Sequence, residues 1–450
     1  MPLKSNKNIY CFLILLATVV IISGCQSIPN SLDKVGVIKE IVAYDQQLSG
    51  NSMDDIARIE VKLKQKISLT ETEAVLYALN NNATFKALLI DLKLAKADLV
   101  NAGLLPNPEL LFAFGMTDKP YRYAIDLPIE ALWLRPIRLR NMKHEADAAA
   151  HRLTQSGLNL IKEVRISYAQ AVLAEEQLKV SEASYQLRNR IYTLSQKRLE
   201  AGDINGKDIL LAQNDAAIAK RDWELAEYDV KIKKQSFLFA LGIGQKYQDI
   251  ALAPNLIPAC NVDEVDQLLT QSLEQRPDVM SAQYSIQASK EKIKLSKLNW
   301  LKFTATADAT SGTQSGHTLG PSIRTTIPIA NRNQGAISRA DGELEKAELS
   351  LEALKQQALL ETKTAHLQYQ QSCHDWRVLQ DTLMPNVQQM IELTERSYQK
   401  GDIAYLQTLE ANRQFIDTQM REVQLKADLI AKYAELMRNN RKKVDANNGS

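Results

Sequence analysis

The residue types that most often do chemistry in proteins are sparse in this chain and rarely stand close together. Cys260 and Cys373 lie far apart in the sequence, and they could form a disulfide or remain as two buried free thiols. Cys373 is followed by His374, but adjacent residues on a helix do not share a face, which argues against a metal site there. The five histidines are otherwise scattered, and the sequence shows no Gly-rich phosphate loop, nucleophile elbow or metal-spaced His and Glu set. We therefore expect no enzyme, no cofactor and no metal site.

The composition favours long helices and excludes nucleic acid as a partner. The chain has 55 Lys and Arg against 53 Asp and Glu, and no basic block stands out. The 17 Gly and 13 Pro cluster at a few places, and the stretches between them are rich in strong helix formers.

The first 24 residues read as a signal peptide. Lys4 and Lys7 precede an apolar run at 9–22 that is too short for a comfortable membrane span. The run ends in a sequence that resembles the bacterial lipoprotein box, with cleavage before Cys25 and lipid attached to its thiol. Gln26 follows instead of Asp, which in sorted lipoproteins implies passage to the outer membrane. The alternative is a small residue near a cleavage site without lipidation.

The rest of the chain carries one pattern twice, about 200 residues apart. Three pairs of segments show it: 77–82 with 271–276, 127–129 with 327–329, and 201–204 with 400–403. This period is too long for a solenoid and indicates two copies of one module. The predicted division is a signal peptide (1–24), a lipidated segment (25–66), a first repeat (67–248), a second repeat (262–438) and a polar tail (439–450).

Each copy has the same predicted order: a helix, a strand pair, a long helix, a Gly-containing turn and another long helix. In the first copy we expect helices over 69–103, 141–200 and 208–241. About 60 helical residues make a rod of about 90 Å, which no compact domain needs. In the second copy apolar residues recur every seven positions, the coiled-coil pattern, at Leu344, Leu351, Ala358 and Ala365. Pro385 should kink or break the rod that contains it.

The strand segments alternate between apolar and polar residues. In 300–310, Phe303, Ala305 and Ala307 face one way, while Thr304 and Thr306 face the other. Such strands suit a transmembrane barrel with lipid outside and water inside, although a half-buried soluble sheet has the same period. Four strands cannot close a barrel, and an open edge in lipid leaves backbone groups unsatisfied. Other copies of the chain must therefore complete the sheet.

In this order, the motifs resemble those of the TolC-like outer-membrane efflux protein family. The carriers are the opening Leu69-Thr70-Glu71-x-Glu73-Ala74-x-x-Tyr77-Ala78-Leu79-x-x-Asn82, Leu104-Leu105-Pro106-Asn107-Pro108, Arg276-Pro277-Asp278, Ile327-Pro328-Ile329-Ala330-Asn331-Arg332 and the two Gly-Asp-Ile turns. The resemblance implies a mainly α fold with a small membrane β-barrel: a homotrimer with four strands per chain, twelve in all, continued by a periplasmic α-helical coiled-coil barrel.

The resemblance also implies a function and partners. The trimer would be a lipid-anchored exit duct in the outer membrane of a Gram-negative bacterium. Through a periplasmic adaptor it would join an inner-membrane transporter, expected to be proton-driven, and passively conduct heavy-metal cations or drugs. The turn at 331–335 looks like that of the heavy-metal efflux members. The alternatives are a duct for type I protein secretion and a lipid-anchored periplasmic coiled-coil scaffold.

The two Gly turns would be the hairpin tips at the periplasmic end. The adaptor contacts that the resemblance implies are Arg198, Leu199, Gly202 and Gly401. Glycine suits a turn of positive φ after a helix, and the following Asp, such as Asp203, is a natural N-cap. Capping alone would also account for both Gly-Asp pairs.

The gate would lie just beyond these tips. Its implied residues are Asp208, Tyr398, Gln407 and Glu410. Because Gln407 is neutral, we expect one threefold carboxylate ring, made by Glu410, and three charges in a narrow pore favour cations. Ile403 stands where relatives can carry an arginine, so this position cannot form their salt bridge.

Overall fold

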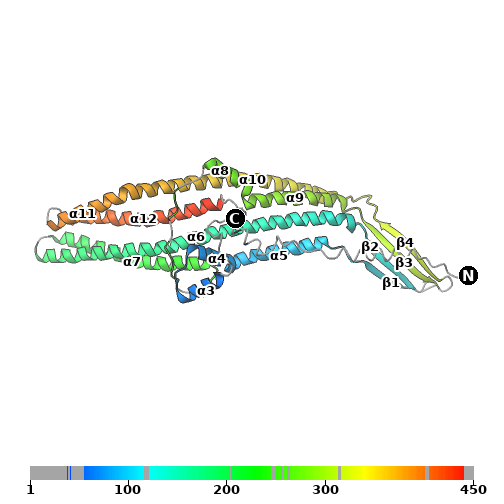
Figure 1. Ribbon diagram of the computed structural model, residues 1–450, viewed down its shortest axis with the longest axis horizontal. Helices are drawn as coiled ribbons and strands as arrows, with labels where there is room; N and C mark the ends of the chain where they lie inside the picture. The colour runs from blue at the N-terminus through cyan, green and yellow to red at the C-terminus, as the bar shows by residue number, and fades with distance from the viewer. Residues whose placement is uncertain are drawn as a thin grey trace, which may run out of the picture. The chain divides into compact units, whose positions relative to one another are not determined.

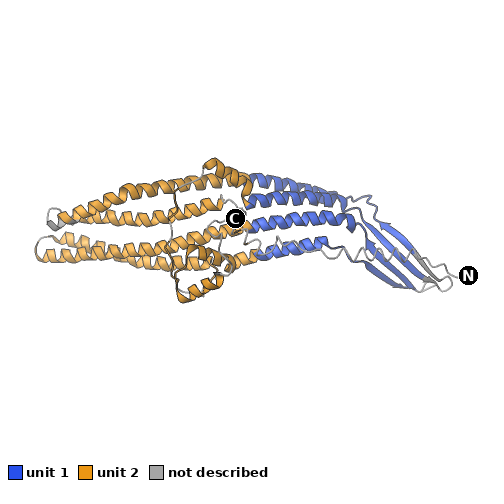
Figure 2. Ribbon diagram, viewed as in Figure 1, with its two compact units in different colours: residues 1–37, 89–153, 277–354 blue, residues 38–88, 154–276, 355–450 orange. Residues whose placement is uncertain are grey.

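The structure is a computed structural model that describes residues 55–115, 121–202, 204–244, 250–254, 257–260, 264–312, 316–400 and 405–439, together with Ile38 and Ile41. The predicted signal peptide, Cys25 and residues 440–450 lie outside the described residues. The chain splits into two compact units (Figure 2). Among the described residues, unit 1 holds Leu89–Leu153 and Pro277–Leu354, and unit 2 holds Ile38–Leu88, Thr154–Arg276 and Lys355 onward.

The fold is mainly α with one small sheet, as predicted (Figure 1). The helices are α3 (Asp55–Gln65), α4 (Glu71–Asn81), α5 (Ala83–Gly103), α6 (Ala131–Glu200), α7 (Gly206–Ala240), α8 (Val265–Gln275), α9 (Pro277–Leu298), α10 (Gln334–Val378), α11 (Met384–Lys400) and α12 (Tyr405–Asn439). The strands are β1 (Glu109–Phe114), β2 (Tyr121–Pro128), β3 (Phe303–Gly312) and β4 (Gly316–Thr325). No helix among the described residues is both long and apolar enough to cross a membrane.

Equivalent elements recur at nearly constant offsets along the chain. α4 and α8 have 11 residues each, and the offset between them is the same as that between the starts of β1 and β3. α7 and α12 have 35 residues each, and the offset between them is slightly longer. The offset therefore changes around the strand pairs, where β3 and β4 have 10 residues each against 6 and 8 in β1 and β2. The boundaries given above for the two repeats remain a prediction.

The prediction of a single helix over 69–103 is wrong, because Asn82 divides this segment into α4 and α5. Asn82 has extended backbone angles, φ −60° and ψ 121°. Its Oδ1 accepts a hydrogen bond from the backbone N–H of Phe85 at 3.1 Å, and its Nδ2 donates to the carbonyl of Ala240 at 3.0 Å. One side chain thus caps the start of α5 and satisfies a free carbonyl at the end of α7. Thr70 begins α4 with a capping box closed by Glu73.

Two prolines lie near the starts of helices. α6 begins at Ala131, earlier than expected, and contains Pro136 in its second turn. Pro385, expected to kink or break its rod, follows a π-helical turn at Leu379–Leu383 that interrupts the α-helix between α10 and α11. In this turn the N–H of Met384 bonds to the carbonyl of Leu379. The widened turn lets the helix continue through the residue that lacks an N–H.

In unit 2, two buried tyrosines on the long helices hold the connecting segments. The hydroxyl of Tyr168, on α6, lies 2.7 Å from the carbonyl oxygens of both Leu69 and Ala253. The hydroxyl of Tyr369, on α10, donates to the carbonyl of Ala259 at 2.9 Å. Burial raises the pKa of both phenols, that of Tyr369 to about 12. These two tyrosines therefore attach the connecting segments at Leu69, Ala253 and Ala259 to the long helices.

The predicted coiled-coil positions on α10 are covered to different degrees. Ala358 and Ala365 are buried, while Leu344 and Leu351 are half-buried. In unit 2, α12 packs on α6 through a cluster of Ala169, Leu173, Val423 and Ile430. Small residues at such positions let neighbouring helices approach closely.

Candidate functional site

The four strands form one antiparallel sheet in the order β1-β2-β3-β4, and their register places like residues on one face. Leu110 pairs with Ile125, which pairs with Ala307; Phe112 pairs with Tyr123. Side chains of directly opposite residues point to the same side of a sheet. The apolar sets read from separate strands therefore share one face.

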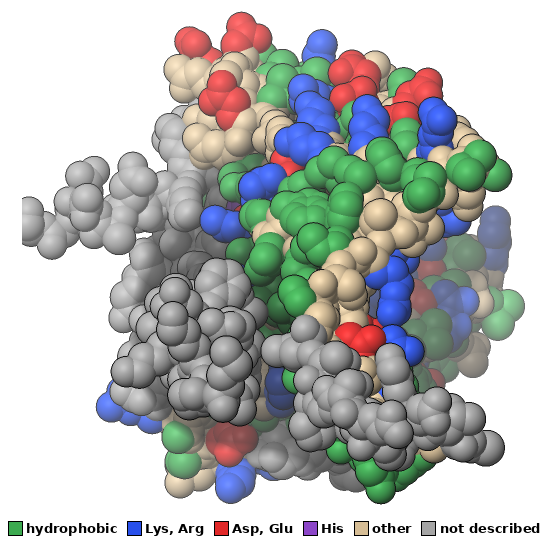
Figure 3. Space-filling model, turned by 90° about the vertical axis from the view of Figure 1, so that its right-hand side faces the viewer, with side chains coloured by type: hydrophobic (Ala, Val, Ile, Leu, Met, Phe, Trp, Pro, Cys, Tyr) green, Lys and Arg blue, Asp and Glu red, His purple; other side chains and the backbone are tan. Residues whose placement is uncertain are grey.

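This apolar face is exposed in the single chain. Leu110 and Phe114 are each 73% exposed, and Ile323 is 70% exposed. Phe112 packs against Phe114 and Tyr123, with ring centroids 4.7 and 4.8 Å apart. Figure 3 views the protein from the side on which Figure 1 draws the strands, and it shows hydrophobic side chains gathered in a band. An apolar surface this continuous marks contact with lipid or with another chain.

The opposite face of the sheet carries paired charges. Arg122 donates to Asp308, with Nη2 and Oδ2 2.7 Å apart. Asp126 accepts from the hydroxyl of Thr306 and lies 3.7 Å from Arg324. Opposite charges on neighbouring strands satisfy one another, so this face is polar and internally paired.

The strand order leaves the sheet open at both edges. Of the described strands, β1 and β4 are the outer ones, each paired along one side only. An outer strand presents a row of N–H and C=O groups to any strand placed beside it. A second copy could pair its β4 with β1 of the first.

Unit 2 contains two helical hairpins, α6–α7 and α11–α12, which lie side by side (Figure 1). Within the first hairpin, Tyr185 stacks on Trp223, and Lys234 lies 2.8 Å from Glu175. At its tip Gly202 has φ +79°, as expected for a left-handed turn residue. Arg198 is half-buried and Leu199 is exposed.

The predicted cap at this tip is wrong. The N-cap of α7 is Asn205 instead of Asp203, which lies outside the described residues. The Oδ1 of Asn205 accepts from the N–H groups of Lys207 and Asp208, at 2.9 and 3.0 Å. Gly202 therefore lies in the turn, and Asn205 starts the helix.

The implied gate residues lie in the first turn of α7, the first two turns of α12 and the last turn of α11. Asp208 is half-buried, and Gln407 and Glu410 are exposed. The side chain of Tyr398 and the whole of Gly401 lie outside the described residues. Glu410 accepts a hydrogen bond from Gln414 at 3.2 Å. A threefold ring from Glu410 stays a prediction.

The two hairpins are joined near their tips by an ion pair that the sequence did not reveal. Asp215, on α7, lies 2.6 Å from Arg413, on α12. The Asp215 side chain is 5% exposed, and its Oδ2 is buried without a hydrogen-bond partner in the described chain. The hydrogen bond to Asp215, with the nearby charges of Glu410 and Asp417, raises the pKa of Arg413. The pair is 198 residues apart, close to the repeat offset, which was the only signal that could have suggested it.

Further along, one more ion pair joins the same hairpins, and a separate cluster joins α12 to α10. Lys426, on α12, lies 3.3 Å from Glu176, on α6. Near the end of α12, Arg438 and Arg276 each lie 3.0 Å from Glu361. Burial alone would raise the pKa of Glu361, but the hydrogen bond from Gln357 and the two arginines hold that pKa below its usual value.

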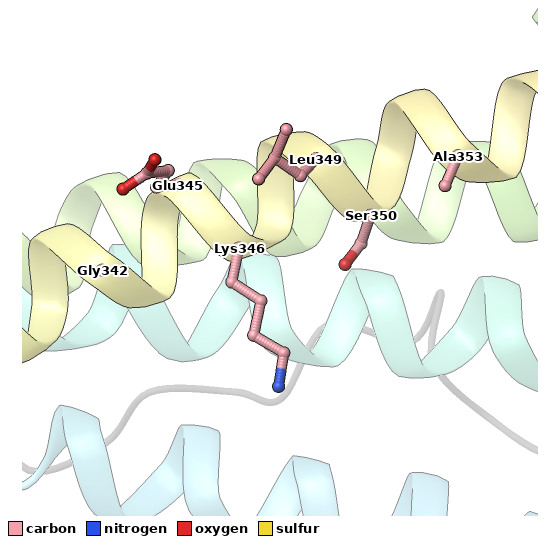
Figure 4. Close-up of a pocket in the computed structure, with 6 residues that line it drawn as sticks. All are labelled: Gly342, Glu345, Lys346, Leu349, Ser350 and Ala353. Carbon is pink, nitrogen blue, oxygen red and sulfur yellow. The ribbon is translucent and has the colours of Figure 1, made fainter.

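The described residues contain no group of three or more His, Cys, Asp or Glu side chains placed to hold a metal ion. The pocket in Figure 4 is lined by one helix alone, through Gly342, Glu345, Lys346, Leu349, Ser350 and Ala353 of α10. Its polar lining is one acid, one base and one serine hydroxyl, all on the same helix.

Comparison with known proteins agrees with this geometry. The family model for the outer membrane efflux protein matches residues 123–243 and 268–439. The chain is 22% identical to the cobalt-zinc-cadmium resistance protein CzcC of Cupriavidus metallidurans, over 78% of this chain and 85% of that protein. It is 24% identical to the probable outer membrane lipoprotein SilC of Salmonella typhimurium, over 76% and 79%. A solved structure of CusC is similar with a TM-score of 0.71, at 17% identity, covering 83% of this chain and 92% of that one.

Proposed function

Because the chain belongs to the outer membrane efflux protein family, we propose that three copies form the outer-membrane exit channel of a tripartite efflux pump. The observation that carries this proposal is the sheet with an exposed apolar face, an ion-paired polar face and two outer strands. Three such sheets joined β4 to β1 make a closed twelve-stranded barrel with lipid outside and water inside.

The barrel predicts opposite environments for neighbouring side chains of β3. Ala307 is on the apolar face and Thr304 on the polar face. In proteoliposomes, Ala307→Cys should react with a lipid-soluble maleimide and be protected from a charged thiosulfonate, and Thr304→Cys should do the reverse. Equal reaction of both with the charged reagent would indicate a half-buried soluble sheet instead.

The helical hairpins of unit 2 form the periplasmic part of this channel. Their tips, at Arg198, Leu199, Gly202 and Gly401, contact a periplasmic adaptor, which joins the channel to a proton-driven inner-membrane transporter. The half-buried Arg198 and exposed Leu199 provide a mixed surface for such a partner. A Leu199→Asp variant should fail to capture the adaptor while still forming trimers. Unchanged capture would move the docking surface elsewhere.

The gate of the channel lies where the two hairpins meet behind these tips. Asp208, Tyr398, Gln407 and Glu410 narrow the pore, and the ion pair of the buried Asp215 with Arg413 holds the first hairpin to the second. A lipid on Cys25 anchors the N-terminal segment to the outer membrane. Mass spectrometry of the mature chain tests this anchor, since an unmodified Cys25 would contradict it.

The cargo that we favour is heavy-metal cations. The support is the naming of similar proteins for cobalt, zinc and cadmium resistance and for cation efflux. Deleting the gene should increase sensitivity to divalent metals more than to drugs, and the wild-type gene should restore tolerance. A loss of protein secretion without a change in metal tolerance would favour the type I secretion duct.

A further inference from the structure

The segment between α7 and α8 is fixed to the helices at two places in different ways. At the first, Leu252 forms a parallel β-bridge with Leu69, closed by hydrogen bonds of 3.0 Å from Leu69 N–H to Ala251 and from Ala253 N–H to Leu69. At the second, a disulfide joins Cys260 of the segment to Cys373 of α10, with Cα atoms 5.7 Å apart. The alternative of two free thiols is therefore not what the structure shows.

The disulfide is a covalent attachment at the second place, made inside a hydrophobic cluster. Cys373 is 5% exposed and lies in a cluster with Leu268, Ala365, Tyr369, Leu429 and Leu436, against which Cys260 packs. The polar contacts there are the 2.9 Å bond from Tyr369 to Ala259 and a 3.5 Å contact from Arg377 to the Cys260 carbonyl. Without the covalent bond, the described part of the segment would keep the packing of Cys260 against this cluster and the two hydrogen bonds.

We propose that the exported chain is a substrate of a periplasmic oxidant of dithiols, and that oxidation of Cys260 and Cys373 fastens the second repeat and thereby stabilises the trimer. In this step the two thiols lose two protons and two electrons as the Sγ–Sγ bond forms. A disulfide-bearing oxidant accepts them by thiol–disulfide exchange, and its own S–S bond is reduced to two thiols. The inference rests on the proposed outer-membrane location, because such oxidants act outside the cytoplasm.

Counting thiols on the wild-type protein tests the bond directly. The chain has four cysteines; Cys11 leaves with the signal peptide, and Cys25 is occupied by lipid. Purified mature protein, denatured with N-ethylmaleimide, should take up no label before reduction and two labels after it. One label before reduction and three after would keep the disulfide but contradict lipidation of Cys25. Two labels before reduction would overturn the disulfide.

The dependence of trimer stability on this bond needs a second experiment. Cys260→Ser, Cys373→Ser and the double variant should lower the melting temperature of detergent-solubilised trimers equally, because each change breaks the same bond. Reductant should lower the melting temperature of the wild-type trimer and leave that of the variant trimers unchanged. Tyr168→Phe, which weakens the first attachment, is the matched control and should stay sensitive to reductant. Additive effects of the two Ser variants, with a wild type insensitive to reductant, would contradict the proposal.

Discussion

At the scale of single residues, the hairpin tips are governed by how charges are buried and paired. Asp215 is almost fully covered and pairs with Arg413. Glu410 lies three residues before Arg413 on the same helix and remains exposed. The first acid therefore holds the hairpins together, while the exposed Glu410 stays accessible for the pore role that we propose.

Replacing Glu410 should change ion selectivity. Glu410→Gln removes three carboxylates from the narrow part of the trimer, and so lowers preference for cations. The reversal potential in a salt gradient across a planar bilayer measures this. Asp428→Asn, an acid further along α12, is the matched control. An unchanged reversal potential for Glu410→Gln would show that Glu410 does not line the constriction.

Breaking the Asp215–Arg413 pair should both destabilise and open the tip. Arg413→Gln leaves a buried carboxylate without its cation, which we expect to cost about 2 kcal/mol because Arg413 is partly exposed. Thermal melting should show this loss, and bilayer recordings should show a larger conductance.

Two further variants separate a latch from a general loss of packing. The double variant Asp215→Asn/Arg413→Gln should recover much of the stability, because no unpaired charge stays buried. Lys426→Gln breaks the Glu176 pair further from the tip and should leave conductance unchanged. Equal opening by Lys426→Gln would contradict a special role for Arg413.

At the scale of elements, the break between α4 and α5 and the end of α7 form one joint. Gly242, just after α7, has φ +75°, and a Cβ there would lie 2.5 Å from the Cα of Asn82. Asn82 caps α5 and bonds to Ala240. Only glycine permits both this backbone conformation and this approach.

Gly242→Ala should therefore destabilise the chain by about 2 to 3 kcal/mol through strain and collision with backbone atoms. The midpoint of denaturant unfolding measures the loss. Gly206→Ala is the matched control, since Gly206 begins α7 with nothing near its Cβ position. Equal effects for the two variants would rule out a special joint at Gly242.

Stability should also fall in acid because of Glu361. Its pKa is lowered in the folded chain, so its contribution is fully present above the ordinary value of 4.5 and is lost as pH falls through the lower folded pKa. Melting temperatures between pH 7 and pH 3 should decline in the wild type, and Glu361→Gln should flatten part of that decline. An identical decline in the variant would contradict this role.

Local sequence signals predicted the elements better than they predicted the joints between them. The alternation in 300–310 and the heptads of α10 depend on near neighbours, and both faces are recognisable in the structure. The break at Asn82 depends on the end of α7 lying beside it, which no local pattern encodes. For the same reason, the sequence did not predict that Asp215 pairs with Arg413. It also did not decide whether Cys260 and Cys373 form a disulfide or remain buried free thiols.

At the scale of the whole molecule, one chain alone does not close its sheet into a barrel. Its sheet has two outer strands and an exposed apolar face. Because outer strands are not tolerated in lipid, the need for other copies follows from the sequence alone, while the number three comes from the family. The roles of the tips and the gate depend on surfaces between copies and partners, so they remain proposals.

Single-channel recording of the purified protein tests the central claim most directly. In detergent, the purified protein should run as a trimer. Reconstituted into a planar bilayer, it should give discrete, steady conductance steps that favour cations. A monomer that gives no conductance would contradict the channel and favour a lipid-anchored scaffold.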